Sequence, residues 1–423
     1  MEIDTKGCPL KPLLALAFLI ALANARAAAP APGARTFDLG TLKPADVFTA
    51  ARGFGFDLGT APVADGRPFF FSVAVPEGSY QVKVMFGDAR AASANTVKAE
   101  SRRLMLESVT TRPGEFVTRT FVVNVRTPAL PPPPPNAPGG ATVVLNDREA
   151  GSLDWDHKLT LEFSGAAPHV RTVDIAPVDV PIVFLLGDST VTDQRSEPGA
   201  SWGQMLPRFF TPDVVVANHA ESGETLKSFL AELRLAKVLS QLKVGDFVLL
   251  QFGHNDQKAQ WPQTYAEAHS TWPAYLRVYL AEIRRRGATP VLVTSMQRRT
   301  FDDDGRIRNS HGDYPEVVRE VAAAERVPLI DLERMSVAFY EALGPTRAPL
   351  AFSNGGKDPT HHDNYGAYEL AKCMAQGIRN ARLPLADYLT ADFTGFDPAH
   401  PDDPATFNLP ASPGRRDLAP RGN

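Results

Sequence analysis

The spacing of apolar residues changes at about Pro181, and this change constrains the fold more than any other feature of the chain. After it, short apolar runs alternate with longer stretches in which apolar residues recur every three or four positions, a pattern typical of strands followed by helices. Such alternation predicts right-handed strand–helix–strand units and a parallel sheet covered by helices on both faces. The expected strands cover residues 182–186, 214–218, 247–252, 290–296 and 327–332.

The preceding part of the chain, residues 35–176, has the pattern of β structure. Runs such as PFFFSVAVPEGSYQVKVMFGD and FVTRTFVVNVR alternate apolar and polar residues, with Pro, Gly and Asn between them. This pattern predicts a β-sandwich ahead of an α/β domain that covers residues 180–391. The Pro-rich segment 127–140 is expected to form a surface loop. Residues 392–423, rich in Pro, Asp and Ala, are expected to form a loosely ordered tail.

Residues 1–27 have the pattern of an export signal. A basic start precedes the apolar run PLLALAFLIALA, and the small-residue site Ala25-Arg26-Ala27 follows it. The run is too short to cross a bilayer comfortably, and the remaining sequence contains no apolar stretch of sufficient length. We therefore expect cleavage near Ala27, a secreted or periplasmic protein, and no membrane span in the mature chain.

Composition excludes several classes of partner and site. The net charge of −4 over 423 residues gives no indication of a nucleic-acid partner. Of the two cysteines, Cys8 leaves with the signal, so the mature chain has one thiol, Cys373, and no internal disulfide. Zinc binding by cysteine pairs is excluded, and we expect neither a metal nor an organic cofactor.

Polar residues follow the expected strands of the α/β domain where a ligand would bind, outside the carboxyl ends of a parallel sheet. The first strand stops at Gly187-Asp188-Ser189, the second leads to Gly223, and the third leads to Asn255. One interpretation is an ordinary turn, since Gly, Asp and Ser are common turn residues. The other is that Ser189 is a nucleophile, with the Ser189 and Gly223 N–H groups and the Asn255 amide forming an oxyanion hole.

A base for Ser189 is available near the C-terminal end of the domain. Asp358 and His361 are three residues apart, just before a helical pattern. A short loop can place the Asp358 carboxylate on His361 Nδ1 and leave Nε2 for the Ser189 hydroxyl. The spacing Asp-x-x-His often occurs without a catalytic role, so it supports a catalytic pair only in combination with the polar residues that follow the strands.

A second serine fits the motif Gly-x-Ser-x-Gly. It lies in Gly199-Ala200-Ser201-Trp202-Gly203, but that motif requires a preceding strand, and residues 194–198 do not form one. Ser189 is therefore the preferred nucleophile.

Four residues are candidates for substrate contacts. Trp202 has a ring that can stack on a sugar, although core packing is the simpler interpretation. Arg298 and Arg299 follow the fourth strand and offer a guanidinium fork to an acidic sugar; the alternative is exposure to solvent or a bridge to residues 302–304. His254 follows the third strand and is expected to support its loop or to contact substrate.

The blocks GDST, the Gly223 loop, GHND and DPTH together resemble the SGNH (GDSL-type) hydrolases. Stretches such as SWGQMLPRF, NHAESGETLKSF and VPLIDLERMS further resemble the rhamnogalacturonan acetylesterases, carbohydrate esterase family twelve, over residues 181–382. The resemblance implies a flavodoxin-like three-layer sheet, a triad of Ser189, His361 and Asp358, and an oxyanion hole of Ser189, Gly223 and Asn255. The β-rich part resembles the galactose-binding-type sandwich that precedes the esterase in one branch of that family.

The chain departs from the family in its second block. That block often reads Gly-Arg-Ser, whereas here Gly223 is followed by Glu224 and Thr225. A carboxyl group at this position is a candidate for altering substrate choice, and it leaves the triad untouched.

The resulting hypothesis is a secreted serine esterase that removes O-acetyl groups from acetylated pectic polysaccharide or oligosaccharide of the rhamnogalacturonan type, through an acetyl-enzyme. Two alternatives stay open. One is a lipase or thioesterase of the same superfamily that acts on longer acyl chains. The other is a carbohydrate-binding protein whose hydrolase domain is inert.

Overall fold

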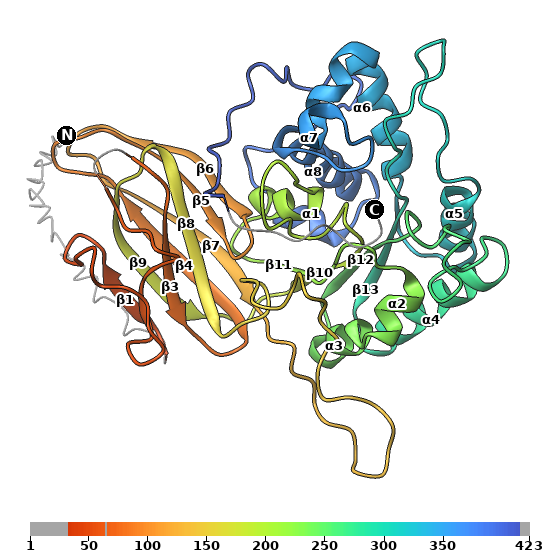
Figure 1. Ribbon diagram of the computed structural model, residues 1–423, viewed down its shortest axis with the longest axis horizontal. Coiled ribbons are helices and arrows are strands. Elements are labelled where there is room, and N and C mark those ends of the chain that lie inside the picture. Colours follow the sequence, from red (N-terminus) through yellow and green to blue (C-terminus); the bar gives the residue numbers. More distant parts are fainter. Residues whose placement is uncertain (1–32, 64–65, 415–423) are drawn as a thin grey trace, which may run out of the picture.

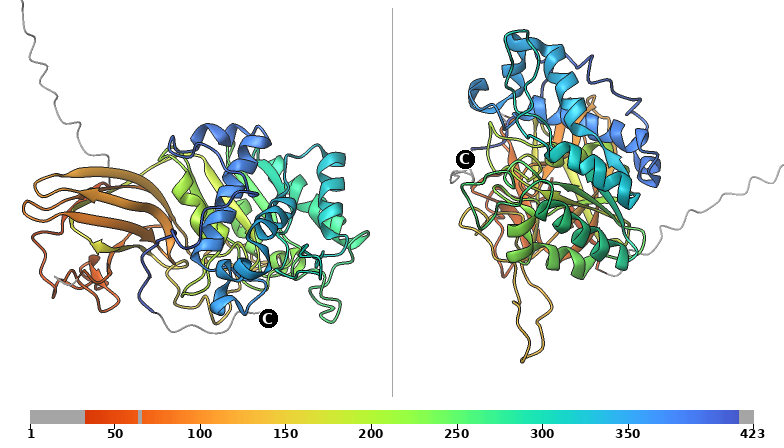
Figure 2. Two further views of the ribbon diagram at one scale, coloured as in Figure 1. Left: turned by 90° about the horizontal axis from the view of Figure 1, so that it is seen from above. Right: turned by 90° about the vertical axis from the view of Figure 1, so that its right-hand side faces the viewer.

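The computed structural model describes residues 33–63 and 66–414. An antiparallel β-sandwich lies beside a larger α/β part, as seen from two directions (Figures 1 and 2). The expected export signal, residues 1–27, falls outside the described residues, as does the end of the expected tail. No helix within the described ranges has the length and apolar character that crossing a membrane requires.

The sandwich consists of two antiparallel sheets whose inner faces share one core. Strand β4 shows why: its residues Tyr80, Val82, Val84 and Phe86 are buried, whereas the residues between them are not. Alternation of this kind gives each strand one face for the core. The first sheet has the order β1 (Arg35–Asp38), β9 (Val170–Pro177), β4 (Gly78–Phe86), β7 (Val117–Val125). The second has the order β2 (Phe54–Asp57), β3 (Phe69–Ala74), β8 (Lys158–Ala167), β5 (Ser93–Ala99), β6 (Arg103–Thr111).

The α/β part is built on a five-stranded parallel sheet with the order β11 (Val215–Asn218), β10 (Ile182–Gly187), β12 (Phe247–Gln251), β13 (Thr289–Val293), β14 (Leu329–Ile330). The strand order 2-1-3-4-5 and the parallel pairing confirm the flavodoxin-like fold expected from the sequence. Strand β10 lies between β11 and β12, so the residues that follow it lie between the loops after those two strands.

Helices cover both faces of this sheet because its strands are apolar on both sides. In β10, Val183 and Leu185 belong to one hydrophobic cluster, and Phe184 and Leu186 to the other. The first cluster is completed by α1 (Trp202–Met205), η1 (Leu206–Phe209), α6 (Leu332–Arg347), η2 (Ala348–Ala351), α8 (Asn364–Asn380) and η3 (Pro384–Tyr388). The second is completed by α2 (Leu226–Ala231), α3 (Arg234–Gln241), α4 (Thr271–Arg285) and α5 (Tyr314–Glu325).

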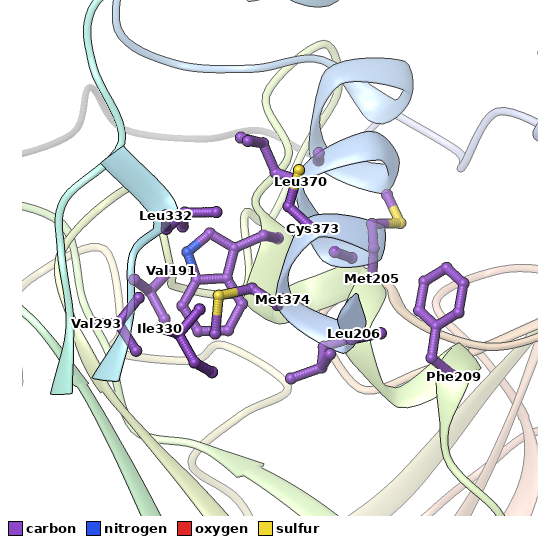
Figure 3. Packing of buried hydrophobic residues seen from close by; sticks show 14 of the residues in the cluster. Val191, Met205, Leu206, Phe209, Val293, Ile330, Leu332, Leu370, Cys373 and Met374 are labelled. Atoms are coloured by element: carbon purple, nitrogen blue, oxygen red, sulfur yellow. The ribbon is translucent and has the colours of Figure 1, made fainter. Parts of the chain in front are cut away.

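The first cluster anchors helix α8 against the sheet (Figure 3). Val293 and Ile330 of the sheet lie next to Met374 of α8, and the thiol of Cys373 is also buried there. The short helix α7 (Ser353–Gly356) and a turn precede α8. Packing of α8 therefore fixes where that turn begins and ends.

The two parts of the molecule meet where the turn between β5 and β6 reaches the loop after β10. Arg102 Nη1 donates to the carbonyl oxygens of Gln194 at 3.1 Å and Gly199 at 2.8 Å. Arg103 Nε donates to Asp193 Oδ2 at 2.6 Å, and both arginines are buried. The sandwich thus holds the backbone that follows strand β10.

Two segments without regular secondary structure, the Pro-rich segment and residues 392–414, differ in how they pack against the protein. The Pro-rich segment projects as a long exposed loop (Figure 1), closed at its base by the Leu130 N–H, which donates to the Ala141 carbonyl at 2.8 Å. Residues 392–414 contain neither helix nor strand, yet they pack against the protein, unlike the loosely ordered tail expected from composition. Phe393 is buried, Phe407 and Leu409 pack on the first cluster, and Lys98 Nζ donates to the Pro410 carbonyl at 2.7 Å.

Candidate active site

The structure brings Ser189, His361 and Asp358 together at the carboxyl end of strand β10. Ser189 lies two residues beyond the end of β10. His361 Nε2 is 2.9 Å from Ser189 Oγ, and His361 Nδ1 is 2.8 Å from Asp358 Oδ2. The imidazole therefore bridges the hydroxyl and the carboxylate in the geometry that a serine nucleophile with a histidine base requires.

The turn that carries Asp358 and His361 is fixed by its own backbone. Asp358 Oδ1 accepts the N–H groups of Thr360 at 2.7 Å and His361 at 3.0 Å, which leaves Oδ2 for the ring. On either side of the ring, the His361 carbonyl accepts the Ser353 N–H at 2.9 Å and the His362 carbonyl accepts the Ala200 N–H at 2.8 Å. The carboxylate and the imidazole are consequently pre-positioned.

The charge of Asp358 is stabilised by these same contacts. Burial alone would raise the pKa of Asp358, but the hydrogen bond and charge of His361 and the two backbone N–H groups lower that pKa below its usual range. Asp358 is therefore a carboxylate at any ordinary pH, suited to hold the proton of His361 on Nδ1.

The three donors expected for an oxyanion hole lie on loops that contact one another. Asn255 Nδ2 donates to the Glu224 carbonyl at 3.2 Å, which ties the loop after β12 to the loop after β11. Gly223 has φ of +85°, a conformation that favours glycine. Within the described residues, no hydrogen bond uses the backbone N–H of Ser189 or Gly223, so both donors can reach a ligand.

Asp256 connects the same loops from beneath. Its Oδ1 accepts the Leu226 N–H at 2.9 Å, and its Oδ2 accepts the Gly253 N–H at 3.0 Å. Burial raises the pKa of Asp256 to about 7 despite these bonds. The neighbouring Thr225 caps helix α2, since its Oγ1 accepts the Ser228 N–H at 3.0 Å.

Asp188, next to Ser189, is fully buried. Its Oδ1 accepts both the N–H and the hydroxyl of Thr190, at 2.9 and 2.8 Å, and burial raises its pKa. These bonds hold the tight turn on which Ser189 lies.

Two of the four candidate residues for substrate contacts, Trp202 and His254, are buried, in line with the alternative interpretations of core packing and loop support. Trp202 is 1% exposed, and its Nε1 donates to Gln251 Oε1 at 2.9 Å within the core. His254 is 2% exposed, its ring packs against His311 at 4.3 Å between centroids, and burial lowers its pKa well below the usual value. Neither side chain is accessible to a sugar, because each belongs to the packing beneath the site.

Arg298 and Arg299 are half-buried near the site and are held by the protein. Arg298 donates to the Ser310 carbonyl at 3.1 Å and the His254 carbonyl at 3.3 Å. Arg299 donates to the Gly356 carbonyl and lies over the Phe352 ring at 5.2 Å. The alternative bridge to residues 302–304 does not form, and substrate binding by these arginines stays a prediction.

The second serine motif has a structural role. Ser201 Oγ donates to the carbonyl oxygens of Val191 at 2.9 Å and Thr192 at 2.7 Å, and it accepts the N–H of Gln204 at the start of α1. Its hydroxyl is therefore committed to the backbone.

A cleft beside His361 includes a residue that the sequence did not indicate. Arg148 comes from the segment between β7 and β8 of the sandwich, and it lines this cleft together with groups of the α/β part. Sequence offered no signal for it, since the contact depends on how two distant parts of the chain pack. The other lining residues are Gln194, Ser196, Glu197, Pro198, Gly199, Ser353, Asn354, Asp358 and His361.

A second hollow, the Trp261 hollow, is lined by residues of the loops after β11 and β12. Its volume is about 470 Å³. It is lined by Ser222, Gly223, Glu224, Ser228, Glu232, Gln260, Trp261, Pro262, Gln263 and Thr264. Glu224 thus lines a hollow large enough for a small ligand. It is also the residue at which the second block departs from the family pattern.

Comparison with known proteins places the site in context. Residues 185–366 match the GDSL-like Lipase/Acylhydrolase family. The rhamnogalacturonan acetylesterase RhgT of Bacillus subtilis is 40% identical over 222 residues, which cover 49% of this chain and 94% of that protein. The uncharacterized esterase YxiM of Bacillus subtilis is 25% identical over 387 residues, which cover 84% of this chain and 93% of that protein. The crystal structure of YxiM aligns with a TM-score of 0.48 and 22% identity, over 83% of this chain and 99% of that one.

Proposed function

The chain belongs to the GDSL-like lipase/acylhydrolase family, and on that premise we propose that it removes O-acetyl groups from pectic polysaccharide of the rhamnogalacturonan type. Its nucleophile in this proposal is Ser189, with His361 as base and Asp358 as the residue that orients the base. The observation that carries the proposal is the 2.9 Å contact between His361 Nε2 and Ser189 Oγ, at the carboxyl end of strand β10.

The reaction proceeds in two halves. Ser189 Oγ attacks the acetyl carbonyl carbon while its proton passes to His361 Nε2, and the carbonyl oxygen becomes an oxyanion. The N–H groups of Ser189 and Gly223 and the amide of Asn255 stabilise that charge. The carbon–oxygen bond to the sugar then breaks, His361 returns the proton to the sugar oxygen, and acetyl-Ser189 remains. Water, deprotonated by His361, then attacks the acetyl carbonyl carbon; the bond to Ser189 Oγ breaks, His361 returns the proton to Oγ, and acetate leaves.

Two relatives support a carbohydrate substrate. RhgT and a second Bacillus subtilis protein, 36% identical over 208 residues, carry the name rhamnogalacturonan acetylesterase, the latter as a probable one. The residues that line the His361 cleft are polar except Pro198 and Gly199, and polar side chains of this kind can hydrogen-bond the hydroxyls of a sugar.

The proposal includes the organisation of the chain. Residues 35–176 form a galactose-binding-like sandwich, residues 180–391 form the esterase, and export follows cleavage of residues 1–27 near Ala27. The N-terminal sequence of exported enzyme would test the last point.

Substrate preference can be tested by varying the length of the acyl group and the identity of the acetylated polysaccharide. We expect kcat/KM for 4-nitrophenyl acetate to exceed that for the octanoate by at least about tenfold, since the polar cleft cannot bury the longer chain. We also expect acetate release from acetylated rhamnogalacturonan fragments to exceed release from acetylated xylan. Colorimetric ester assays and chromatographic measurement of acetate give both ratios. Preference for octanoate would indicate a lipase or thioesterase, and equal release from xylan would contradict pectic specificity.

A further inference from the structure

The Trp261 hollow shares Gly223 with the proposed oxyanion hole and is much larger than an acetyl group. Gly223 lines it, and the N–H of the same residue is a proposed donor to the oxyanion. A volume of about 470 Å³ lies within the range of small-molecule sites. Acetyl transfer leaves most of this space unused.

The loop that carries Trp261 is firmly held although it contains neither helix nor strand. The Trp261 carbonyl accepts the N–H groups of Thr264 at 3.0 Å and Tyr265 at 2.8 Å. Lys227 Nζ, from helix α2, donates to the carbonyl oxygens of Pro262 and Tyr265, both at 3.1 Å. Lys258 Nζ lies 4.3 Å from the Trp261 ring centroid. A partly exposed indole fixed in this way is a platform that loses little entropy on binding.

The rest of the lining is polar and carries carboxyl groups. Glu224 is buried, its Oε2 accepts the Ser228 hydroxyl at 2.7 Å, and burial raises its pKa well above the usual value. Glu232, Gln260 and Gln263 add further oxygen and nitrogen atoms. Such groups hydrogen-bond hydroxyls well.

We propose that the Trp261 hollow binds an uncharged pyranose ring of the substrate chain, adjacent to the ring that carries the ester. The indole of Trp261 packs against the apolar face of this ring, and the glutamines bind its hydroxyls. This inference rests on the proposed function and deepens it, because it adds recognition of a neighbouring sugar to removal of the acetyl group.

A length series tests the hollow separately from the chemistry. We expect W261A to lower kcat/KM for an acetylated pectic oligosaccharide by about tenfold more than for the acetylated monosaccharide, because only the longer substrate contacts the indole and the loss of one aromatic contact changes binding by about this factor. W261F should recover part of the difference. F116A, which removes a 47% exposed ring on the sandwich, is the control and should not change the ratio.

The outcomes separate the two proposals. If wild type releases no acetate from any pectic substrate, the proposed function fails. If wild type is active and W261A affects oligosaccharide and monosaccharide equally, the hollow is no sugar site. If W261A changes instead the ratio of octanoyl to acetyl ester hydrolysis, the hollow takes acyl chains, which also overturns the inference.

A different observation concerns how the sandwich contributes to the site. Arg148 Nη1 donates to Ser222 Oγ at 2.7 Å and to Glu221 Oε1 at 3.2 Å, and Nη2 donates to Gln194 Oε1 at 3.2 Å. Gln194 Nε2 in turn donates to the Ser189 carbonyl at 2.7 Å. One buried guanidinium thereby links the residue before Gly223 to the backbone of the nucleophile.

The segment that carries Arg148 is itself anchored on the esterase. Glu149 pairs with Arg234 of helix α3, with Nη2–Oε2 at 2.6 Å, and also accepts Trp155 Nε1 at 3.0 Å. The Val144 N–H donates to the Glu232 carbonyl at 3.0 Å. Arg148 is therefore delivered to the cleft by a fixed backbone.

The geometry points to Arg148 as a positioning residue that the sandwich supplies to the esterase. It acts through Ser222 and Gln194, holding the N–H groups of Gly223 and Ser189 where the oxyanion forms. The sandwich is thus part of the catalytic structure in addition to any binding of glycan.

Chemical rescue tests this role. We expect R148A to lower kcat for 4-nitrophenyl acetate by about 10- to 100-fold with little change in KM, because a displaced oxyanion donor costs up to about 10³-fold. Millimolar guanidinium, far below denaturing concentration, should restore part of kcat in R148A. R208A is the control: it breaks the Arg208–Glu107 contact of 2.8 Å between the two parts, outside the cleft.

A purely structural role predicts a different result. It predicts that R148A and R208A lower thermal stability alike and that neither variant responds to guanidinium. A kcat loss below about fivefold in R148A, or a loss that guanidinium does not reverse, would overturn the assignment.

Discussion

Replacing Ser189 with alanine is expected to lower kcat for acetyl-ester hydrolysis by about 10⁵- to 10⁶-fold. The change removes the oxygen that lies 2.9 Å from His361 Nε2 and leaves no other hydroxyl in its place. The proposed oxyanion donors remain, so a residual rate above that of water should persist. Acetate release measured with excess enzyme over long incubation gives the residual rate, and binding of an acetylated oligosaccharide to S189A should resemble that of wild type.

The chain offers a matched control in Ser201. S201A removes a hydroxyl that donates to the backbone and accepts the Gln204 N–H at the start of α1. We expect it to lower stability by about 1 kcal/mol through loss of the helix cap, with kcat changed by less than about threefold. Loss of activity in S201A together with retention in S189A would reverse the assignment of the nucleophile.

The features that could be predicted from the sequence are local or follow from strand order. The apolar runs fixed which segments become parallel strands, and the right-handed connection rule placed the ends of β10, β11 and β12 together. Asp358 and His361 are three residues apart, so one tight turn suffices to join them. The Asp358–His361 pair is therefore local, whereas its approach to Ser189, 172 residues away along the chain, depends on the packing of α8.

The features that could not be predicted depend on packing between distant parts. Trp202 looks like a loop residue beside the site, yet it follows Ser201 into a short helix and its ring enters the core. Arg148 reaches the cleft only because the sandwich docks on the esterase, and no spacing in the sequence encodes that docking. Phe393 and Phe407 likewise anchor a Pro-rich tail whose composition predicted loose order.

The Asp358→Asn variant is expected to lower kcat by about 10⁴-fold. The reason lies in the turn: two backbone N–H groups donate to Oδ1 of residue 358, so an asparagine keeps its oxygen there and turns its NH₂ toward His361 Nδ1. Nδ1 then becomes an acceptor and the ring proton moves to Nε2, where it faces Ser189 Oγ and prevents that nitrogen from acting as a base.

The same substitution has a predictable effect on stability. The folded-state pKa of Asp358 is lowered, so its carboxylate stabilises the native state above the unfolded pKa of about 3.9 and that contribution disappears as the pH falls. Thermal unfolding should therefore show wild type more stable than D358N at neutral pH, with the gap narrowing toward pH 3.

Substitution of a neighbouring carboxylate, Asp363, distinguishes loss of the correct His361 orientation from a general effect of removing a negative charge. Asp363 caps helix α8 by accepting the Gly366 N–H at 3.0 Å, and asparagine caps helices equally well. D363N should keep kcat within about threefold of wild type. Because the asparagine in D358N imposes the wrong tautomer whatever the pH, raising the pH should not restore its rate. Recovery of activity at high pH, or an equal loss in D363N, would mean that Asp358 acts by its charge alone and not by fixing the proton on Nδ1.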